Sequence, residues 1–475
     1  MIENASVLLL YIMAVPFMGI IFTALSKDSS LSRGRNALSV GILTVIANLL
    51  LLWIVAHKID HSGAGLQLVT SFEWLDTPKI ELLLGIDVFS LSLIAAIHFA
   101  ILLGFIGVRN NNYRMKTLVI LTLMFLEMVI GYLLSGDLFS FYIFFEAMLL
   151  PLFMLVGIYG DVRRQETLSR FFMYNLLGAM LLFVALCILF HYQNVTIHDI
   201  SRVTIKHNIA IVVWSAIFIA FLSRIPIWPF HYWISSVNVN ISNPLVFIIA
   251  NIIPLTGVYG LIRFFPLTAP GILEPYLLVL KIISIVTMII IALIGFGNRD
   301  IQYKIFSYMT VFYILYLLGA LLPTDALLSN IGFSIFSWLI IISAIEVMVA
   351  YLEKEKQRSN RSDLGLLNNV SRSSIVMSFF VLAAVGMPLS SMFLNNMLIF
   401  SGLFLYNLKM TMFILTAIIL SCLGLLQYMF YLRYPSEENN KVTAIEDISI
   451  PVFVFFVAIM LLMVTSFVNP LWYME

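Results

Sequence analysis

Charged residues are scarce in this chain. Of its 475 residues, 11% are charged and 61% are hydrophobic, whereas soluble domains are roughly 25% charged. So few charges cannot cover the surface of a soluble protein of this length, and the composition predicts a polytopic membrane protein. The net charge of +1 excludes binding of nucleic acid through bulk positive charge. We therefore expect the lipid bilayer, and no nucleic acid, among its partners.

Cysteine is almost missing as well. The two cysteines, Cys187 and Cys422, both lie in apolar runs, which excludes a disulfide scaffold, a CxxC metal site and an iron–sulfur cluster carried by this chain. The sequence also lacks the GxGxxG, P-loop, HExxH and CxxCH motifs. We therefore expect no cofactor, no metal and no redox centre in this chain.

Long apolar runs are what the sequence has in abundance. The first run has no basic segment before it and is longer than a usual signal-peptide core, so we expect it to be retained as a span. A transmembrane helix needs about 20 apolar residues, and about 14 runs of roughly this length follow one another in the chain. We therefore predict an all-α polytopic membrane protein with about 14 transmembrane helices. We place them at residues 7–25, 38–56, 82–108, 117–135, 138–159, 167–190, 208–222, 243–264, 275–297, 303–322, 329–351, 373–399, 409–432 and 449–468.

Lysine and arginine are distributed unevenly between the connections. With these spans, 18 of the 26 fall in connections after odd-numbered helices and 6 in connections after even-numbered ones. The remaining two are Lys281, which lies within a span, and Arg224, which lies at the broken end of helix seven. Because cytoplasmic loops are enriched in positive charge, this pattern predicts odd connections in the cytoplasm and both termini outside.

Two of the predicted helices contain helix-breaking residues. Pro226 and Pro229 interrupt helix seven, and Gly386-Met-Pro388 interrupts helix twelve. Paired breaks in corresponding positions are typical of transporters with repeated halves. We therefore predict two inverted five-helix repeats. The expected domains are 1–116 (helices 1–3), 117–265 (first repeat, helices 4–8), 275–433 (second repeat, helices 9–13, degenerate) and 449–475 (helix 14).

Ionisable residues within the spans are the candidate functional residues, because a charge in the bilayer costs several kcal/mol and marks a functional site by default. Glu146 lies well inside helix five, and the candidate partner for its carboxylate is Arg224 at the break in helix seven. Glu127 lies in helix four, and His231 flanks the break. We interpret these four residues as a proton path or an intramembrane charge pair. His231 has an equally weighted alternative, as a core histidine beside an opened backbone.

Four other ionisable residues have simpler interpretations. Lys304, Asp300 and Asp87 lie near span ends and are expected at the membrane interface. Glu346 is about two helical turns from Glu353, so an interfacial position and a buried functional one stay open for it.

Several stretches of the sequence together resemble a known family. The strongest resemblance covers residues 82–265 and is carried by Gly85–Ser90, Phe125–Gly131, Asp137–Pro151, Arg170–Gly178, Pro229–Trp233 and Tyr259–Phe264, followed by Arg299–Ile301. They are similar to the antiporter-like subunits, of the subunit M or chain 4 type, of the proton-pumping NADH–quinone oxidoreductase (respiratory complex I). The resemblance implies 14 helices with helices seven and twelve broken. The related subunits of multi-subunit sodium–proton antiporters share that fold.

The resemblance also assigns roles, position by position. Glu146 and Glu127 match the family's glutamates on helices five and four, while Arg224 occupies the position of the helix-seven lysine. Two positions that are ionisable in the family hold Leu255 and Asn396 here, and the family's histidines on helices ten and eleven are also missing, near Phe312 and Ser337. Leucine and asparagine do not titrate, and arginine keeps its proton. The resemblance therefore implies a divergent member or paralogue with a degenerate second half.

The expected function is that of a membrane-arm subunit of a respiratory NADH–quinone oxidoreductase, taking part in proton translocation coupled to electron transport. NADH and quinone would bind to other chains, and the other membrane-arm subunits of complex I would be its partners. Two alternatives stay open: a subunit of a multi-subunit sodium–proton antiporter, and a non-pumping scaffold paralogue. We expect a bacterial inner (plasma) membrane in preference to the mitochondrial inner membrane.

Overall fold

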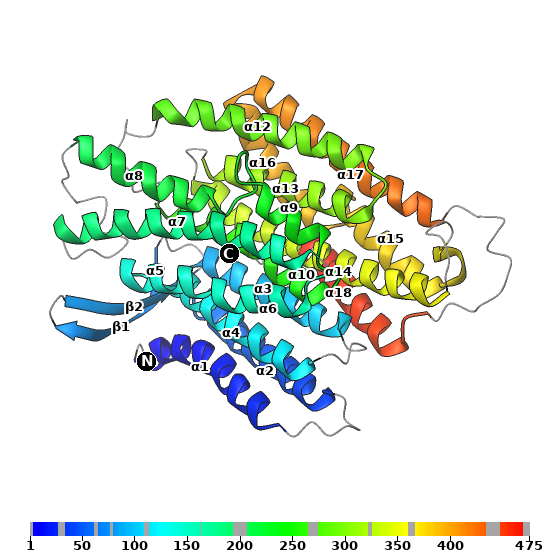
Figure 1. The fold of residues 1–475 in the computed structure, drawn as a ribbon, viewed down its shortest axis with the longest axis horizontal. Coiled ribbons are helices and arrows are strands. Elements are labelled where there is room, and N and C mark those ends of the chain that lie inside the picture. The colour runs from blue at the N-terminus through cyan, green and yellow to red at the C-terminus, as the bar shows by residue number, and fades with distance from the viewer. Residues whose placement is uncertain are drawn as a thin grey trace.

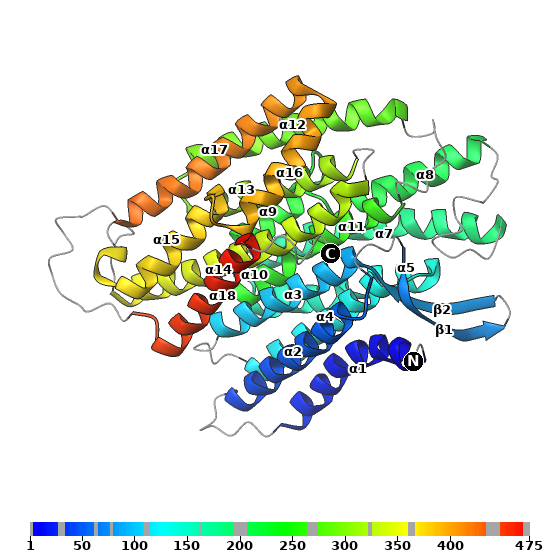
Figure 2. The ribbon, with the colours of Figure 1, turned by 180° about the vertical axis from the view of Figure 1, so that it is seen from behind.

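The computed structural model describes residues 3–26, 34–60, 65–76, 79–108, 114–161, 163–192, 207–264, 274–321, 325–359, 366–433 and 447–468. These residues form a bundle of roughly parallel and antiparallel helices with one β-hairpin (Figures 1 and 2). The elements are α1 (Glu3–Leu25), α2 (Arg35–Ala56), β1 (Gln67–Asp76), β2 (Lys79–Ile86), α3 (Val88–Gly107), α4 (Met115–Leu134), α5 (Leu138–Ala147), α6 (Leu149–Tyr159), α7 (Arg164–Tyr192), α8 (His207–Leu222), α9 (Tyr232–Val239), α10 (Pro244–Ala250), α11 (Ile253–Phe264), α12 (Glu274–Gly297), α13 (Ile301–Ala320), α14 (Asp325–Ser359), a 3-10 turn (Leu366–Asn369), α15 (Ser371–Val385), α16 (Ser391–Tyr406), α17 (Leu408–Arg433) and α18 (Ile450–Val468).

The helices confirm an all-α polytopic membrane protein. Within the described residues, 11 helices are long and apolar enough to cross a membrane, and four shorter apolar helices accompany them. The α10–α11 segment and α13 are buried almost throughout, whereas α1, α2, α7, α12 and α17 leave many apolar side chains on the outside. The total of 14 spans, the inverted repeats and the domain limits stay predictions.

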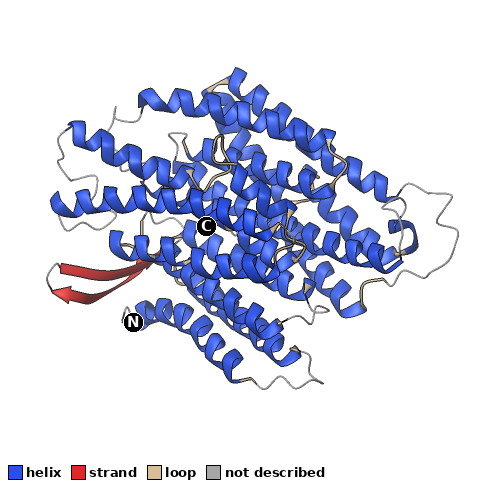
Figure 3. Cartoon of the chain, viewed as in Figure 1, coloured by secondary structure: helices blue, strands red, loops and turns tan. Residues whose placement is uncertain are grey.

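The β-hairpin is a departure from the sequence analysis, which began helix three at residue 82. The antiparallel strands β1 and β2 project from the side of the bundle (Figure 3), and α3 starts only after Asp87. The Asp87 side chain accepts a hydrogen bond from the backbone N–H of Ser90 (2.8 Å), while the Ser90 hydroxyl accepts one from the N–H of Asp87 (3.0 Å). This capping box fixes the start of the helix, so the apolar residues before it are free to pair as a strand.

The predicted breaks in helices seven and twelve are confirmed. Nine residues separate the end of α8 from the start of α9, and Gly386, which has a left-handed φ of 92°, caps the end of α15 five residues before α16 begins. The structure adds two interruptions, between α5 and α6 and between α10 and α11. In both cases a proline, Pro151 or Pro254, lies four residues after the last residue of the earlier helix. A proline clashes with the carbonyl group four residues before it and donates no hydrogen bond, which explains both positions.

A loop residue, Asp447, joins the start of α18 to the start of α15. Its carboxylate accepts hydrogen bonds from the backbone N–H groups of Arg372 (2.8 Å) and Ser373 (3.0 Å) and from the Ser373 hydroxyl (2.6 Å). Those N–H groups lie in the first turn of α15, where the preceding Val370 provides no side-chain cap. Burial alone would raise the pKa of Asp447, but these donors bring it below its ordinary value of 3.8.

We expect Asp447→Ala to lower the free energy of unfolding by about 1–2 kcal/mol, as for other lost helix caps. Ser373→Ala should cost less, because it removes one donor and leaves the N–H bonds. Since the folded pKa is depressed, the stabilisation is present above the unfolded pKa of about 3.9 and is lost as the pH falls through the lower folded value. Thermal unfolding of the detergent-solubilised protein measures both effects, and equal losses for the two variants would contradict the assignment.

Candidate functional site

The buried cation of the first half is Arg224, in the non-helical segment between α8 and α9. Its side chain is fully buried. The guanidinium donates hydrogen bonds to the carbonyl oxygen of Phe145 and to Thr256 Oγ1 (2.9 Å), and it lies over the Phe145 ring, 3.2 Å from the ring centre. Phe145 is in the last turn of α5, where carbonyls lack helical partners and carry the negative end of the helix dipole. A helix end, a hydroxyl and an aromatic face thus compensate the buried charge.

Two glycines allow the neighbouring helices to approach this segment. A Cβ atom on Gly257 of α11 would lie 2.8 Å from the Phe221 carbonyl oxygen and 3.0 Å from the Cβ of Arg224. A Cβ atom on Gly178 of α7 would overlap the Ser223 side chain. The close packing of α7 and α11 around the break therefore depends on residues without a side chain.

Glu146 and Arg224 are close enough for their charges to interact, but they form no direct salt bridge. Within the described residues no ion pair joins the two side chains, and Glu146 Oε2 has no hydrogen-bond partner. The reason is the geometry of α5. The guanidinium contacts Phe145, and the next helical residue points in a different direction. Glu146 instead shares the face of Tyr142, one turn earlier, whose ring packs against Phe183 of α7 at 5.3 Å between centres.

A row of polar side chains leads from Thr256, the partner of the buried cation, to one end of α11. Thr256, Tyr259 and Arg263 are spaced i, i+3 and i+7, so they share one face of the helix. Arg263 Nε donates to the Tyr259 hydroxyl (2.9 Å), and its guanidinium forms an ion pair with Asp87 at 2.7 Å. Tyr132 of α4 packs against Tyr259, with ring centres 5.4 Å apart, and donates to the Thr256 carbonyl oxygen (2.8 Å). We call these five residues the polar row.

The sequence analysis missed most of the polar row. It placed Asp87 at the membrane interface and gave no role to Thr256 or Tyr132. One signal in the sequence could have predicted the polar row. A single apolar run contains a threonine, a tyrosine and an arginine at helical spacing. Burial alone would raise the pKa of Asp87, but Arg263 and the donors of Ser90 hold it below 3.8. Asp87 is therefore an ionised anchor for Arg263 at the start of α3.

Glu127 and His231 lie outside the polar row. Glu127 is buried in α4, and its Oε2 has no hydrogen-bond partner. His231 directly precedes α9, with its ring 4.8 Å from that of Tyr232 and with Nδ1 unbonded. The contacts of Arg224 include neither residue. Their roles in a proton path stay predictions.

Two ionisable residues of the second half are enclosed by neighbouring helices. Lys304 is only 3% exposed, and its ammonium donates to Gln427 Oε1 (2.9 Å) and the Gly295 carbonyl oxygen (3.4 Å). Helices α12 and α17 pack against α13 and enclose this first turn. Glu346 is 1% exposed, and neither carboxylate oxygen is hydrogen-bonded; both interpretations of this residue stay predictions.

Around the break between α15 and α16, the polar contacts of the described residues are made by neutral groups. Asn396 is buried with Oδ1 unbonded, and the Ser337 and Ser391 hydroxyls lie 2.8 Å apart. Tyr308 donates to a carbonyl oxygen in the last turn of α15 (2.9 Å). Leu255 is likewise buried in α11. Within the described residues, no three His, Cys, Asp or Glu side chains are grouped so that they could hold a metal ion.

Comparisons with known proteins agree with this architecture. Residues 135–424 match the family model described as NADH:quinone oxidoreductase/Mrp antiporter, TM. NADH-quinone oxidoreductase subunit M of Rickettsia bellii (strain RML369-C) is 24% identical over 449 residues, covering 92% of this chain and 90% of the relative. NADH-ubiquinone oxidoreductase chain 4 of Arabidopsis thaliana is 30% identical over 372 residues, covering 75% and 72%.

Solved structures share the fold over nearly the whole chain. A chain of respiratory complex I from Thermus thermophilus, with bound NADH, aligns with a TM-score of 0.80 at 19% identity, covering 97% of this chain and 96% of that one. A chain of the Mrp complex from Dietzia sp. DQ12-45-1b aligns with a TM-score of 0.79 at 17% identity, covering 99% and 96%. The fold is therefore common to a redox-linked complex and an antiporter complex.

Proposed function

Because this chain belongs to the NADH:quinone oxidoreductase/Mrp antiporter transmembrane family, we propose that it is a membrane-arm subunit of a respiratory NADH–quinone oxidoreductase and takes part in proton translocation coupled to electron transport. The observation that carries this proposal is the match to a named subunit M over about nine-tenths of both chains. The fold alone does not separate this function from that of an antiporter subunit, since both complexes contain it. NADH, quinone and the redox centres belong to partner chains.

Within this chain, we assign proton exchange to Glu146. Its Oε2 atom is buried without a hydrogen-bond partner, so the carboxyl group is free to gain or lose a proton as its surroundings change. Arg224 cannot exchange its proton near neutral pH. Its role is that of a fixed cation that joins the end of α5 to α11 at the break after α8.

The second half favours a second candidate function, a non-pumping scaffold. Leu255 and Asn396 occupy positions at which the family has ionisable groups, and the contacts near Asn396 are made by hydroxyls and amides. Lys304 and Glu346 are two buried ionisable groups that a displaced path through this half would use. If they carry no protons, this half serves to hold neighbouring subunits.

We place the chain in a bacterial inner membrane with both termini outside, beside other membrane-arm subunits. The apolar outer faces of α1, α2, α7, α12 and α17 are suited to lipid or to those neighbours.

Affinity purification of the tagged chain in mild detergent tests the assignment to a complex. We expect NADH dehydrogenase subunits and NADH:quinone oxidoreductase activity to elute with it. A preparation that contains sodium–proton antiporter subunits and oxidises no NADH would contradict the proposal and support the antiporter alternative.

A further inference from the structure

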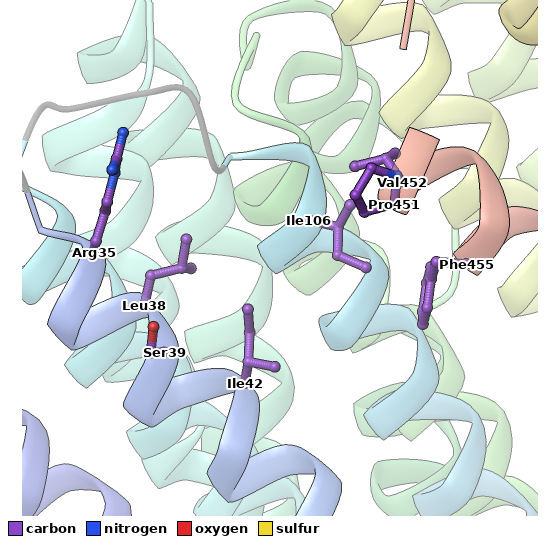
Figure 4. A pocket seen from close by; sticks show the side chains of 8 residues that line it. All are labelled: Arg35, Leu38, Ser39, Ile42, Ile106, Pro451, Val452 and Phe455. Carbon is purple, nitrogen blue, oxygen red and sulfur yellow. The ribbon is translucent and has the colours of Figure 1, made fainter. Parts of the chain in front are cut away.

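A groove of about 410 Å³ opens between the first turns of α2 and α18, with the end of α3 behind it (Figure 4). Apolar side chains from all three helices line most of it, among them Leu38, Ile42, Ile106 and Phe455. The polar lining is confined to α2, where it consists of Arg35 and Ser39.

Along α2, the lining begins with a cation at the end of the helix and is mostly apolar deeper in. Arg35 is the first residue of the helix, and Leu38, Ser39 and Ile42 follow within two turns on the same side. At 1.5 Å per residue, Ile42 lies about 10 Å deeper along the helix than Arg35. A cation at the helix end with an apolar channel below it matches a phospholipid, whose phosphate stays at the interface while its acyl chains enter the bilayer. Arginine is suited to the phosphate, because its guanidinium can donate two parallel hydrogen bonds.

The lining of the groove favours a phospholipid over an apolar helix of a neighbouring subunit. Its cation lies at the end of α2, where a headgroup would lie, and its apolar side chains lie deeper and come from three helices. We propose that this groove, here named the Arg35 groove, binds one phospholipid with an anionic headgroup through Arg35 and takes part of an acyl chain along Leu38 and Ile42. The proposal needs a membrane location but not proton pumping, so it stands independently of the proposed function.

Photo-crosslinking in native membranes tests the proposal on the full chain in its complex. A diazirine-bearing amino acid replaces Ser39, and mass spectrometry identifies what is attached to the peptide after irradiation. In membranes that contain phosphatidylethanolamine and phosphatidylglycerol, we expect lipid adducts in which the anionic lipid is enriched about fivefold over its share of the bulk membrane. This factor corresponds to about 1 kcal/mol for one arginine near an anionic surface.

Two arginine variants separate specific binding from general attraction. Arg35→Gln should abolish the enrichment, whereas Arg299→Gln, which removes an exposed arginine from another connection, should preserve it. Adducts with a neighbouring polypeptide, adducts with the lipid composition of the bulk membrane, or no adduct at all would each overturn the proposal. If Arg35→Gln prevents assembly, the lipid composition of the adducts on the chain that keeps Arg35 still shows whether the groove selects an anionic lipid.

Discussion

Replacing Glu146 by glutamine is expected to lower the number of protons moved per electron while NADH oxidation and assembly of the complex persist. Glutamine has nearly the same shape but cannot exchange a proton. Loss of a positioned proton-transfer group typically slows the step about 10²–10⁴-fold, so the flux through this chain should effectively stop. The number of protons per electron is measured with the purified complex in vesicles, as the proton uptake for each NADH consumed.

A matched control is Glu166→Gln. Glu166 is an exposed glutamate in an i, i+4 ion pair with Arg170 on α7, so its replacement should leave the proton stoichiometry unchanged. An assembled Glu146→Gln complex with normal stoichiometry would remove Glu146 from the proton path and leave the scaffold function as the better account of this chain.

The second large effect is expected from Arg224→Leu. This change leaves two buried acceptors, the Phe145 carbonyl oxygen and Thr256 Oγ1, without their donor. An unsatisfied buried group costs about 1–3 kcal/mol, and the Phe145 ring also loses its cation. Because the three contacts join α5 and α11 to the broken helix, we expect a lower yield of folded chain and a lower midpoint of thermal unfolding in detergent.

Arg224→Lys provides the graded comparison. A lysine keeps the charge, but its compact ammonium lacks the planar guanidinium that reaches both acceptors and stacks on the Phe145 ring. We therefore expect the lysine variant to lose about half as much stability as the leucine variant. Arg299→Leu, at an exposed position, controls for the loss of a positive charge. A leucine variant as stable as the wild type would show that the buried guanidinium does not hold these helices together.

The breaks in the helices show how far local reasoning extends. Helix seven contains two prolines close together, and helix twelve combines a glycine with a proline, so both breaks were predicted and confirmed. Pro151 and Pro254 were equally visible in the sequence, but a single proline is tolerated in the first turn of a helix. Whether such a proline lies in the middle of one helix or at the start of a second depends on which groups donate hydrogen bonds to the carbonyls at the end of the first helix. At the end of α5, Arg224 donates to the Phe145 carbonyl oxygen from 79 positions away in the sequence.

The sequence by itself determined the class of protein, the approximate positions of the apolar segments and some of the residues that carry buried charge, among them Glu127 and Arg224. Those properties follow from the bilayer, which requires long apolar helices and makes each ionisable residue within them conspicuous. Only the tertiary structure decided where those charges find their partners. Arg224 donates its hydrogen bonds to a helix end and a hydroxyl, Lys304 donates to Gln427 of α17, and Asp87 pairs with Arg263 of α11. The physical reason is that a buried charge is stabilised by whichever dipoles and donors the neighbouring helices bring within about 3 Å, and helix adjacency is not encoded in any single run of residues.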